Sequence, residues 1–116
     1  MTLKELEVIL QAEVIVGSDN QDFNIESACS ADMMSSVLYY HTPNSLLITS
    51  LTQQHVIRTA EIAGIKIIVF VLNKQPDQAT IDLAKEKNIP ILVTSYCMYT
   101  ASGRLFEAGL PGCLNK

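Results

Sequence analysis

The chain has 116 residues, 48% of them hydrophobic, and a formal net charge of −4. Its length fits one domain, and this hydrophobic content is typical of a folded chain rather than a disordered one. Lys and Arg form no cluster, which excludes the concentrated positive charge that binding to duplex nucleic acid requires. No apolar run approaches the roughly 20 residues that span a bilayer, and the N-terminus lacks the pattern of a signal peptide. We therefore expect a cytoplasmic protein whose partners include neither nucleic acid nor membrane.

The first third of the chain predicts two helices and two short strands. Thr2 and Glu5 have the spacing of a capping box, in which each side chain bonds the other residue's backbone amide. Ser30 has the side chain of an N-cap and precedes the second helix. The expected elements are a helix over Thr2–Gln11, strands over Glu13–Val16 and Phe23–Cys29, and a helix over about Ala31–His41.

The rest of the chain repeats one pattern three times: an apolar strand, a short polar turn and a helix. The three pairs are Ser45–Thr49 with Thr52–Gly64, Lys66–Val71 with Pro76–Lys87, and Pro90–Thr94 with Tyr96–Gly109. Strands rich in Ile, Leu and Val that alternate with helices predict a parallel sheet covered on both faces. We expect an α/β fold, a three-layer αβα sandwich, in which the N-terminal strand pair adds an antiparallel or mixed edge. Residues 1–110 form the single domain, and residues 111–116 form a loose tail.

Small polar residues follow each of the three parallel strands, and they define a candidate ligand site. The carboxyl ends of such strands meet at one edge of the sheet, where ligands of open α/β folds bind. Helix N-termini beside them favour an anion such as a phosphate or carboxylate. The candidate residues are Thr49, Ser50, Thr52, Arg58, Asn73, Lys74, Thr94 and Ser95.

Three of these residues also have a simpler interpretation. Thr52 is equally suited to be the N-cap of the following helix. Arg58 is placed to pair with Glu61, three residues later on the same helix. Lys74 is also typical of a solvent-facing turn. The sequence alone leaves these alternatives open.

No pattern of catalytic residues accompanies this site. The chain contains no P-loop, no dinucleotide-binding glycine motif and no nucleophile elbow. Cys29, Cys97 and Cys113 are widely separated and form no C-x-x-C pair, so we expect three reduced thiols and no metal site. Cys97 lies in the first turn of a predicted helix, where its pKa is lowered, but no His is near it in sequence. We expect neither a cofactor nor an enzymatic activity.

The last helix has two apolar faces, which suggests that it is buried on two sides. Met98, Ala101, Ser102 and Leu105 form the face expected against the sheet. The second face consists of Tyr99, Gly103, Phe106 and Leu110. A glycine inside a helix costs roughly 1 kcal/mol relative to alanine, and close approach of another backbone is one reason to accept that cost. This face predicts a homodimer interface, with packing against the N-terminal helix as the alternative.

Several stretches together resemble the DRTGG-domain family. They are residues 31–38, 47–52, 56–61, 89–95 and 103–106, and the resemblance extends from about Leu3 to Leu110. The Asp-Arg-Thr-Gly-Gly string itself is absent, and its nearest counterpart is Arg58-Thr59 followed by Ala60-Glu61. Members of the family accompany CBS-domain pyrophosphatases and some phosphotransacetylases, and a related fold forms the N-terminal domain of HPr kinase/phosphorylase. The resemblance implies a regulatory, dimeric module with an enzyme as its partner.

Two functional hypotheses follow. The first is a non-catalytic regulatory module that senses a small anionic metabolite or a nucleotide at the carboxyl ends of the parallel strands. The second is a dimerisation or scaffold domain that binds no ligand and works through protein–protein contacts. The first depends on Thr52 and Arg58, whereas the second depends on Tyr99 and Phe106.

Overall fold

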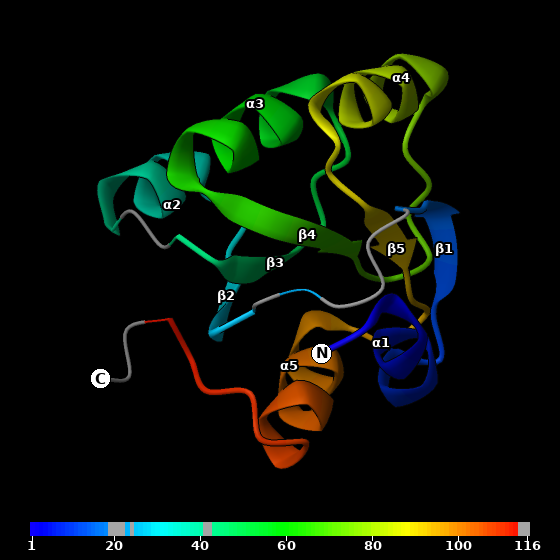
Figure 1. The fold of residues 1–116 in the computed structure, drawn as a ribbon, viewed down its shortest axis with the longest axis vertical. Coiled ribbons are helices and arrows are strands. Elements are labelled where there is room, and N and C mark those ends of the chain that lie inside the picture. The colour runs from blue at the N-terminus through cyan, green and yellow to red at the C-terminus, as the bar shows by residue number, and fades with distance from the viewer. Residues whose placement is uncertain (19–22, 24, 41–42, 114–116) are drawn as a thin grey trace.

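A central sheet covered by helices on both faces makes up the fold of the computed structural model (Figure 1). The structure describes residues 1–18, 23, 25–40 and 43–113. In chain order the elements are α1 (Leu3–Leu10), β1 (Glu13–Val16), β2 (Ser27–Ser30), α2 (Met34–Tyr40), β3 (Ser45–Thr49), α3 (Gln54–Ala63), β4 (Ile65–Phe70), α4 (Gln78–Lys87), β5 (Ile91–Val93) and α5 (Met98–Glu107). Among the described residues, no helix is long and apolar enough to cross a membrane.

The five strands lie in the order β1-β5-β4-β3-β2. Neighbouring strands are parallel except at one edge, where β1 runs antiparallel to β5. The prediction of a mainly parallel sheet with a mixed edge near the N-terminus is confirmed. The two N-terminal strands do not pair with each other, however, because β2 lies parallel to β3 at the opposite edge. Helix α2 makes the crossover that returns the chain from β2 to β3 in the same direction.

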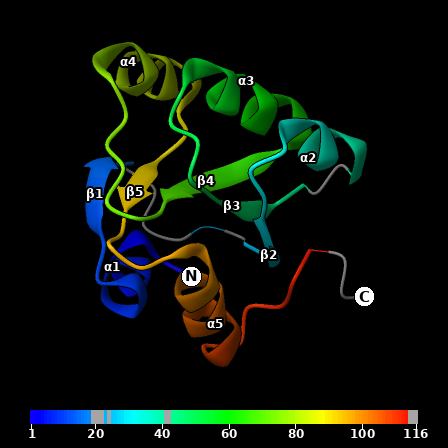
Figure 2. The same cartoon turned by 180° about the vertical axis from the view of Figure 1, so that it is seen from behind.

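The helices form two layers, which confirms the predicted sandwich. Helices α2, α3 and α4 cover one face of the sheet, and α1 and α5 cover the other (Figures 1 and 2). Successive strand residues point to opposite faces, so Leu47 and Ile68 pack under α3 while Leu46 and Ile67 pack under α1 and α5. All five residues of β3 are buried, as expected for a strand covered on both sides.

The first helix is capped as predicted, whereas helices α3, α4 and α5 each begin two residues later than predicted. The capping box of Thr2 and Glu5 is confirmed. Thr52 is not an N-cap, because α3 begins after Gln53, whose side chain makes no capping hydrogen bond. Helix α4 begins after Asp77 rather than at Pro76, since the Asp77 carboxylate accepts a 2.8 Å hydrogen bond from the Thr80 amide. Helix α5 begins after Cys97.

The second strand and helix are shorter than predicted. Strand β2 begins at Ser27 rather than Phe23, and Ser30 ends this strand instead of capping a helix. Helix α2 starts at Met34, because Asp32, in the intervening turn, bonds to the end of β3. The predicted end of this helix at His41 lies outside the described residues.

The tail that we expected to be loose from residue 111 lies against the sheet as far as Cys113. The Ala28 amide donates to the Pro111 carbonyl and the Cys113 amide donates to the Ala28 carbonyl, each over 2.9 Å. These bonds form a short parallel bridge between Ala28 and Gly112, which pairs part of the otherwise open edge of β2. The last three residues, 114–116, lie outside the described residues.

We expect the stability of the fold to depend on the middle of β4. Ile68 is fully buried, so Ile68→Ala should lower the free energy of unfolding by about 2–5 kcal/mol, since it removes apolar burial and leaves a cavity. The control is Ile62→Ala on α3, where the side chain is 66% exposed and the change should stay within about 0.5 kcal/mol. Urea unfolding followed by circular dichroism measures both. Equal effects of the two substitutions would contradict this description of the core.

Candidate functional site

The carboxyl end of β3 holds a compact hydrogen-bonded cluster around Asp32. The Thr49 hydroxyl and the Ser50 amide donate to Oδ1 of Asp32 over 2.9 and 2.8 Å. The Ser50 hydroxyl donates to Oδ2 over 2.7 Å. Hydroxyls and an amide that we expected to hold a ligand anion therefore already hold a carboxylate of the protein itself.

The cluster stabilises Asp32 in its charged form. Partial burial opposes ionisation, but the hydrogen bonds from Ser50 and Thr49 and the positive charge of Lys74 outweigh it, so the pKa of Asp32 lies below its ordinary value of 3.8. The positive charge of Lys74 thus acts on the Asp32 carboxylate at the end of β3, and its expected contact with a ligand anion stays a prediction. The anion it faces in this structure is Asp32.

Backbone hydrogen bonds connect the carboxyl ends of β4 and β5. The Thr94 hydroxyl is buried and donates to the Leu10 carbonyl over 2.6 Å, so it does not face a ligand. The backbone amide of Asn73 donates a hydrogen bond to the Thr94 carbonyl over 2.8 Å. Ser95 is exposed beside these strand ends. The structure thus brings Thr94 and Asn73 together through their backbones, while the Thr94 hydroxyl bonds to the end of α1.

The remaining two candidate ligand residues lie on or near α3. Thr52 is half-buried just before that helix, and Arg58 is exposed on it. The alternative pairing of Arg58 with Glu61 is wrong, because Glu61 bonds to Lys87 of α4, with 3.2 Å between Oε2 and Nζ. Within the described part of the chain, Arg58 makes no ion pair.

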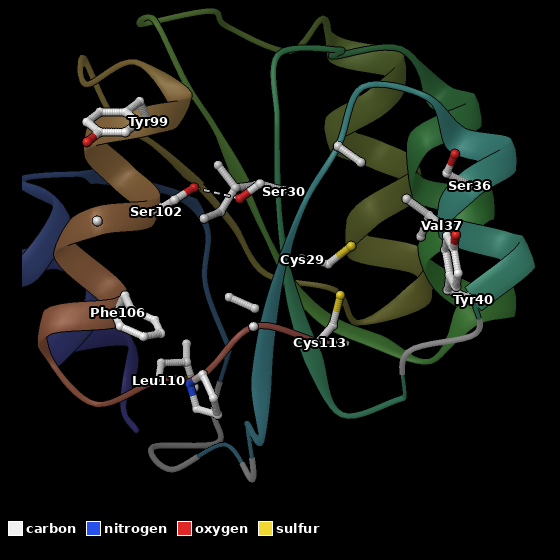
Figure 3. Close-up of a pocket in the computed structure, with 16 residues that line it drawn as sticks. Cys29, Ser30, Ser36, Val37, Tyr40, Tyr99, Ser102, Phe106, Leu110 and Cys113 are labelled. Carbon is white, nitrogen blue, oxygen red and sulfur yellow. Dashed lines mark hydrogen bonds between the residues drawn. The ribbon is translucent and has the colours of Figure 1, made fainter. Parts of the chain in front are cut away.

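An open groove lies elsewhere, along the edge strand β2. It encloses about 790 Å³ and runs between α5 and α2, with the C-terminal tail along one side (Figure 3). Its lining combines residues from β2, α2, β3, α5 and the tail: Ala28, Cys29, Ser30, Ala31, Ser36, Val37, Tyr40, Ile48, Tyr99, Ser102, Gly103, Phe106, Leu110, Pro111, Gly112 and Cys113. All four residues of the predicted interface face of α5 belong to this set.

The described lining of the groove is mainly apolar. Among residues 1–18, 23, 25–40 and 43–113, no Asp, Glu, Lys, Arg or His lines it. Two of its hydroxyls satisfy each other, because Ser30 and Ser102 share a 2.6 Å hydrogen bond across its floor (Figure 3). A volume of this size with an apolar lining and few polar groups is typical of a binding site, and the absence of cations suits a neutral or apolar occupant.

Large aromatic side chains stand on both walls of the groove. Tyr99 and Phe106 of α5 are 89% and 64% exposed, so packing against α1 does not cover them. On α2, the exposed Tyr40 lines the opposite wall, and it forms an edge-to-face pair with Tyr39, outside the groove lining, with 5.1 Å between ring centroids. Leu110 differs from the other predicted interface residues, because it is buried in the core layer beneath α5. The exposed aromatic face is therefore wider than the sequence indicated and includes α2.

The exposed thiol of Cys97 has a lowered pKa. Cys97 is exposed just before α5, and its Sγ lies 3.5 Å from the Thr100 hydroxyl. Hydrogen bonds from Thr100 lower the pKa of Cys97. Among the described residues, no three potential ligands from His, Cys, Asp and Glu lie close enough together to hold a metal ion.

The fold is a three-layer α/β domain. It has a hydrogen-bonded cluster around Asp32 at the end of β3 and an open apolar groove along β2. The sequence profile of the DRTGG domain matches residues 5–108, so the chain belongs to the DRTGG-domain family. The resemblance stated from the sequence is thereby confirmed. A search of curated proteins gives no significant match.

A solved structure shares the fold. It comprises the CBS and DRTGG domains of the regulatory region of Clostridium perfringens pyrophosphatase, complexed with its activator diadenosine tetraphosphate. The TM-score is 0.69 at 20% sequence identity, and the alignment covers 95% of this chain and 47% of that one. The chain thus spans about half the length of that relative.

We expect Asp32→Asn to change how stability depends on pH. Because the pKa of Asp32 is lowered in the folded state, its contribution is present above the ordinary pKa and is lost as the pH falls through the lowered one. The substitution should lower the free energy of unfolding near pH 7 by about 1 kcal/mol and flatten its decrease in acid. Urea unfolding between about pH 6 and pH 3 measures both effects. The control is Glu107→Gln on the exposed end of α5, and an identical pH profile for the two variants would contradict the prediction.

Proposed function

We propose that this chain is a non-catalytic regulatory module that works through protein–protein contact, as a homodimer formed across the groove face of α2 and α5. The observation that carries the proposal is the apolar groove with exposed aromatic side chains on both walls. Exposed apolar patches rimmed by polar residues mark interaction sites, and aromatic residues are enriched at the centres of interfaces. An enzyme is the class of partner whose activity such a dimer would regulate.

A glycine on the outer face of α5 supports close approach of another backbone. A Cβ placed on Gly103 would meet no described heavy atom within 4 Å outside its own stretch of helix. Packing within one chain therefore does not require a glycine there, although glycine is unfavourable inside a helix. A second chain against α5 would supply the missing reason.

A second copy also fits the shape of this face. The same surface carries both projecting rings, Tyr99 and Phe106, and the hollow between α5 and α2 (Figure 3). A twofold dimer places the same surface patch of two chains face to face, so that patch must carry both the projecting side chains and the hollows that receive them. The described residues of the groove lining carry no charge, so they cause no like-charge repulsion in such an arrangement.

We expect Phe106→Glu to dissociate the dimer, because it places a charge at the centre of an apolar contact. Sedimentation velocity at micromolar concentration should show a dimer for the unmodified chain and a monomer for the variant. Ile62→Glu is the matched control, since Ile62 is similarly exposed but lies on α3, on the other face of the sheet. A monomeric unmodified chain would contradict the proposal.

Gly103→Ala distinguishes the effect of this residue on the stability of α5 from its effect on association of two chains. In one chain the added methyl group meets open space, so alanine should stabilise the monomer by up to about 1 kcal/mol. In the dimer the same methyl group should weaken association by at least about tenfold, because it holds the two backbones apart. Thermal unfolding and sedimentation measure the two effects, and a more stable variant that dimerises unchanged would contradict the role of Gly103.

A second candidate function, sensing of an anion, is supported by the donors around Asp32. Thr49 and Ser50 direct three hydrogen bonds at one carboxylate, with Lys74 adding positive charge. A phosphate group would take the place of Asp32, and Thr52, Arg58, Asn73, Lys74 and Ser95 would supply further contacts. A similar fold was solved in complex with diadenosine tetraphosphate.

Removing the competing carboxylate tests this candidate. Asp32→Ala should create or strengthen stabilisation by nucleotides in a thermal-shift panel, and adding Arg58→Ala should reduce it. A ligand at about 100 times its Kd adds roughly 2.7 kcal/mol of stability. No nucleotide-dependent shift in either variant would leave the homodimer as the function.

A further inference from the structure

Two of the three cysteines lie side by side at the floor of the groove. Ala28 of β2 forms a parallel bridge with Gly112 of the tail, and Cys29 and Cys113 are the next residues along each strand. Their thiols point toward each other (Figure 3), and the presence of Cys113 is one of the causes that raise the pKa of Cys29. These residues are far apart in sequence, so only the fold brings them together.

The backbone geometry suits a covalent bond between them. Neighbouring strands lie about 4.8 Å apart, and a disulfide needs Cα atoms roughly 4.4–6.8 Å apart with converging Cβ vectors. Side chains directly across a bridge project from the same face of a sheet. A bond between the two sulfur atoms therefore requires rotation of the side chains rather than movement of the backbone.

We propose that Cys29 and Cys113 are a redox modification site, at which a reversible disulfide fastens the C-terminal tail to the edge of the sheet. The oxidant is a small-molecule disulfide such as glutathione disulfide. The Cys113 thiolate attacks it, forms a mixed disulfide and releases one glutathione thiolate. The Cys29 thiolate then attacks the Cys113 sulfur and releases the second glutathione thiolate. Two cysteine thiols are oxidised, one glutathione disulfide is reduced, and the two protons pass to the released thiolates.

The surroundings of the two thiols set this order of attack. Burial, together with the neighbouring Cys113 thiol, raises the pKa of Cys29 to about 12. Cys29 is therefore the poorer first nucleophile. Cys113 is half-exposed at the last described turn of the tail. Cys97 is exposed and contacts Thr100, so it should accept glutathione and keep it as a mixed disulfide.

The bond would act on the tail and on the groove. Two backbone hydrogen bonds hold the tail to Ala28, and a covalent bond beside them would keep Pro111–Cys113 on the groove wall. It would also close a loop that contains most of the chain, which restricts the unfolded state strongly. Oxidation should therefore raise the melting temperature of the chain. This inference rests on the thiol pair and is independent of the proposed dimer.

The test uses the whole chain, incubated in its folded state with glutathione disulfide. Mass spectrometry with peptide mapping should find the loss of two hydrogen atoms in a bond between Cys29 and Cys113, glutathione on Cys97, and monomer mass on a non-reducing gel. The melting temperature should rise by at least about 5 °C, and dithiothreitol should reverse both changes. Glutathione left on Cys113 without the internal bond, or a bond that forms only in urea, would overturn the proposal.

Matched variants separate the pair from the third thiol. Cys97→Ser should keep the internal bond and the rise in melting temperature, and lose only the glutathione adduct. Cys113→Ser should abolish the bond while Cys97 still accepts glutathione. If Cys113→Ser does not fold, the Cys97→Ser chain decides alone, because its two remaining thiols must then disappear together in a thiol titration. Retention of both thiols in that variant would overturn the proposal.

Discussion

Burial of the central strands on both faces is the constraint on which the rest of the structure depends. Each residue of β3 is buried, and the side chains of β3 and β4 alternate between the two helical layers. A strand in that position must be apolar on both sides and must have a neighbour along each edge. The crossover helices follow from this requirement, and so does the placement of polar residues at strand ends, where the backbone leaves the core.

The same constraint explains why the polar groups at the strand ends are hydrogen-bonded within the chain. A hydroxyl at the end of a buried strand must find a hydrogen-bond partner. Thr49 finds the Asp32 carboxylate and Thr94 finds the Leu10 carbonyl. Polar strand ends that looked like ligand donors thus have structural partners in this chain. The open apolar volume lies instead along β2, where the edge of the sheet is only partly covered.

The candidate sites differ in how far the sequence could predict them. Tyr99 and Phe106 were predictable as a face because α5 repeats apolar residues at helical spacing, a local property of one segment. The aromatic residues of α2 gave a weaker indication of an exposed face. The sequence of neither helix indicated that α2 would lie across the groove from α5. Asp32 gave no signal at all as a partner of Ser50, because their contact depends on how the turn after β2 meets the end of β3.

The sequence by itself determined the fold class, the order of helices and strands, and the family, since periodicity and apolar content report on each segment's own surroundings. The tertiary structure alone decided which distant segments meet. It placed β2 at the edge opposite β1 and laid the tail beside Ala28, and in doing so formed the groove and brought Cys29 to Cys113. The physical reason is that strand order and tail docking depend on contacts between residues far apart in the chain, which leave no periodic trace in either segment.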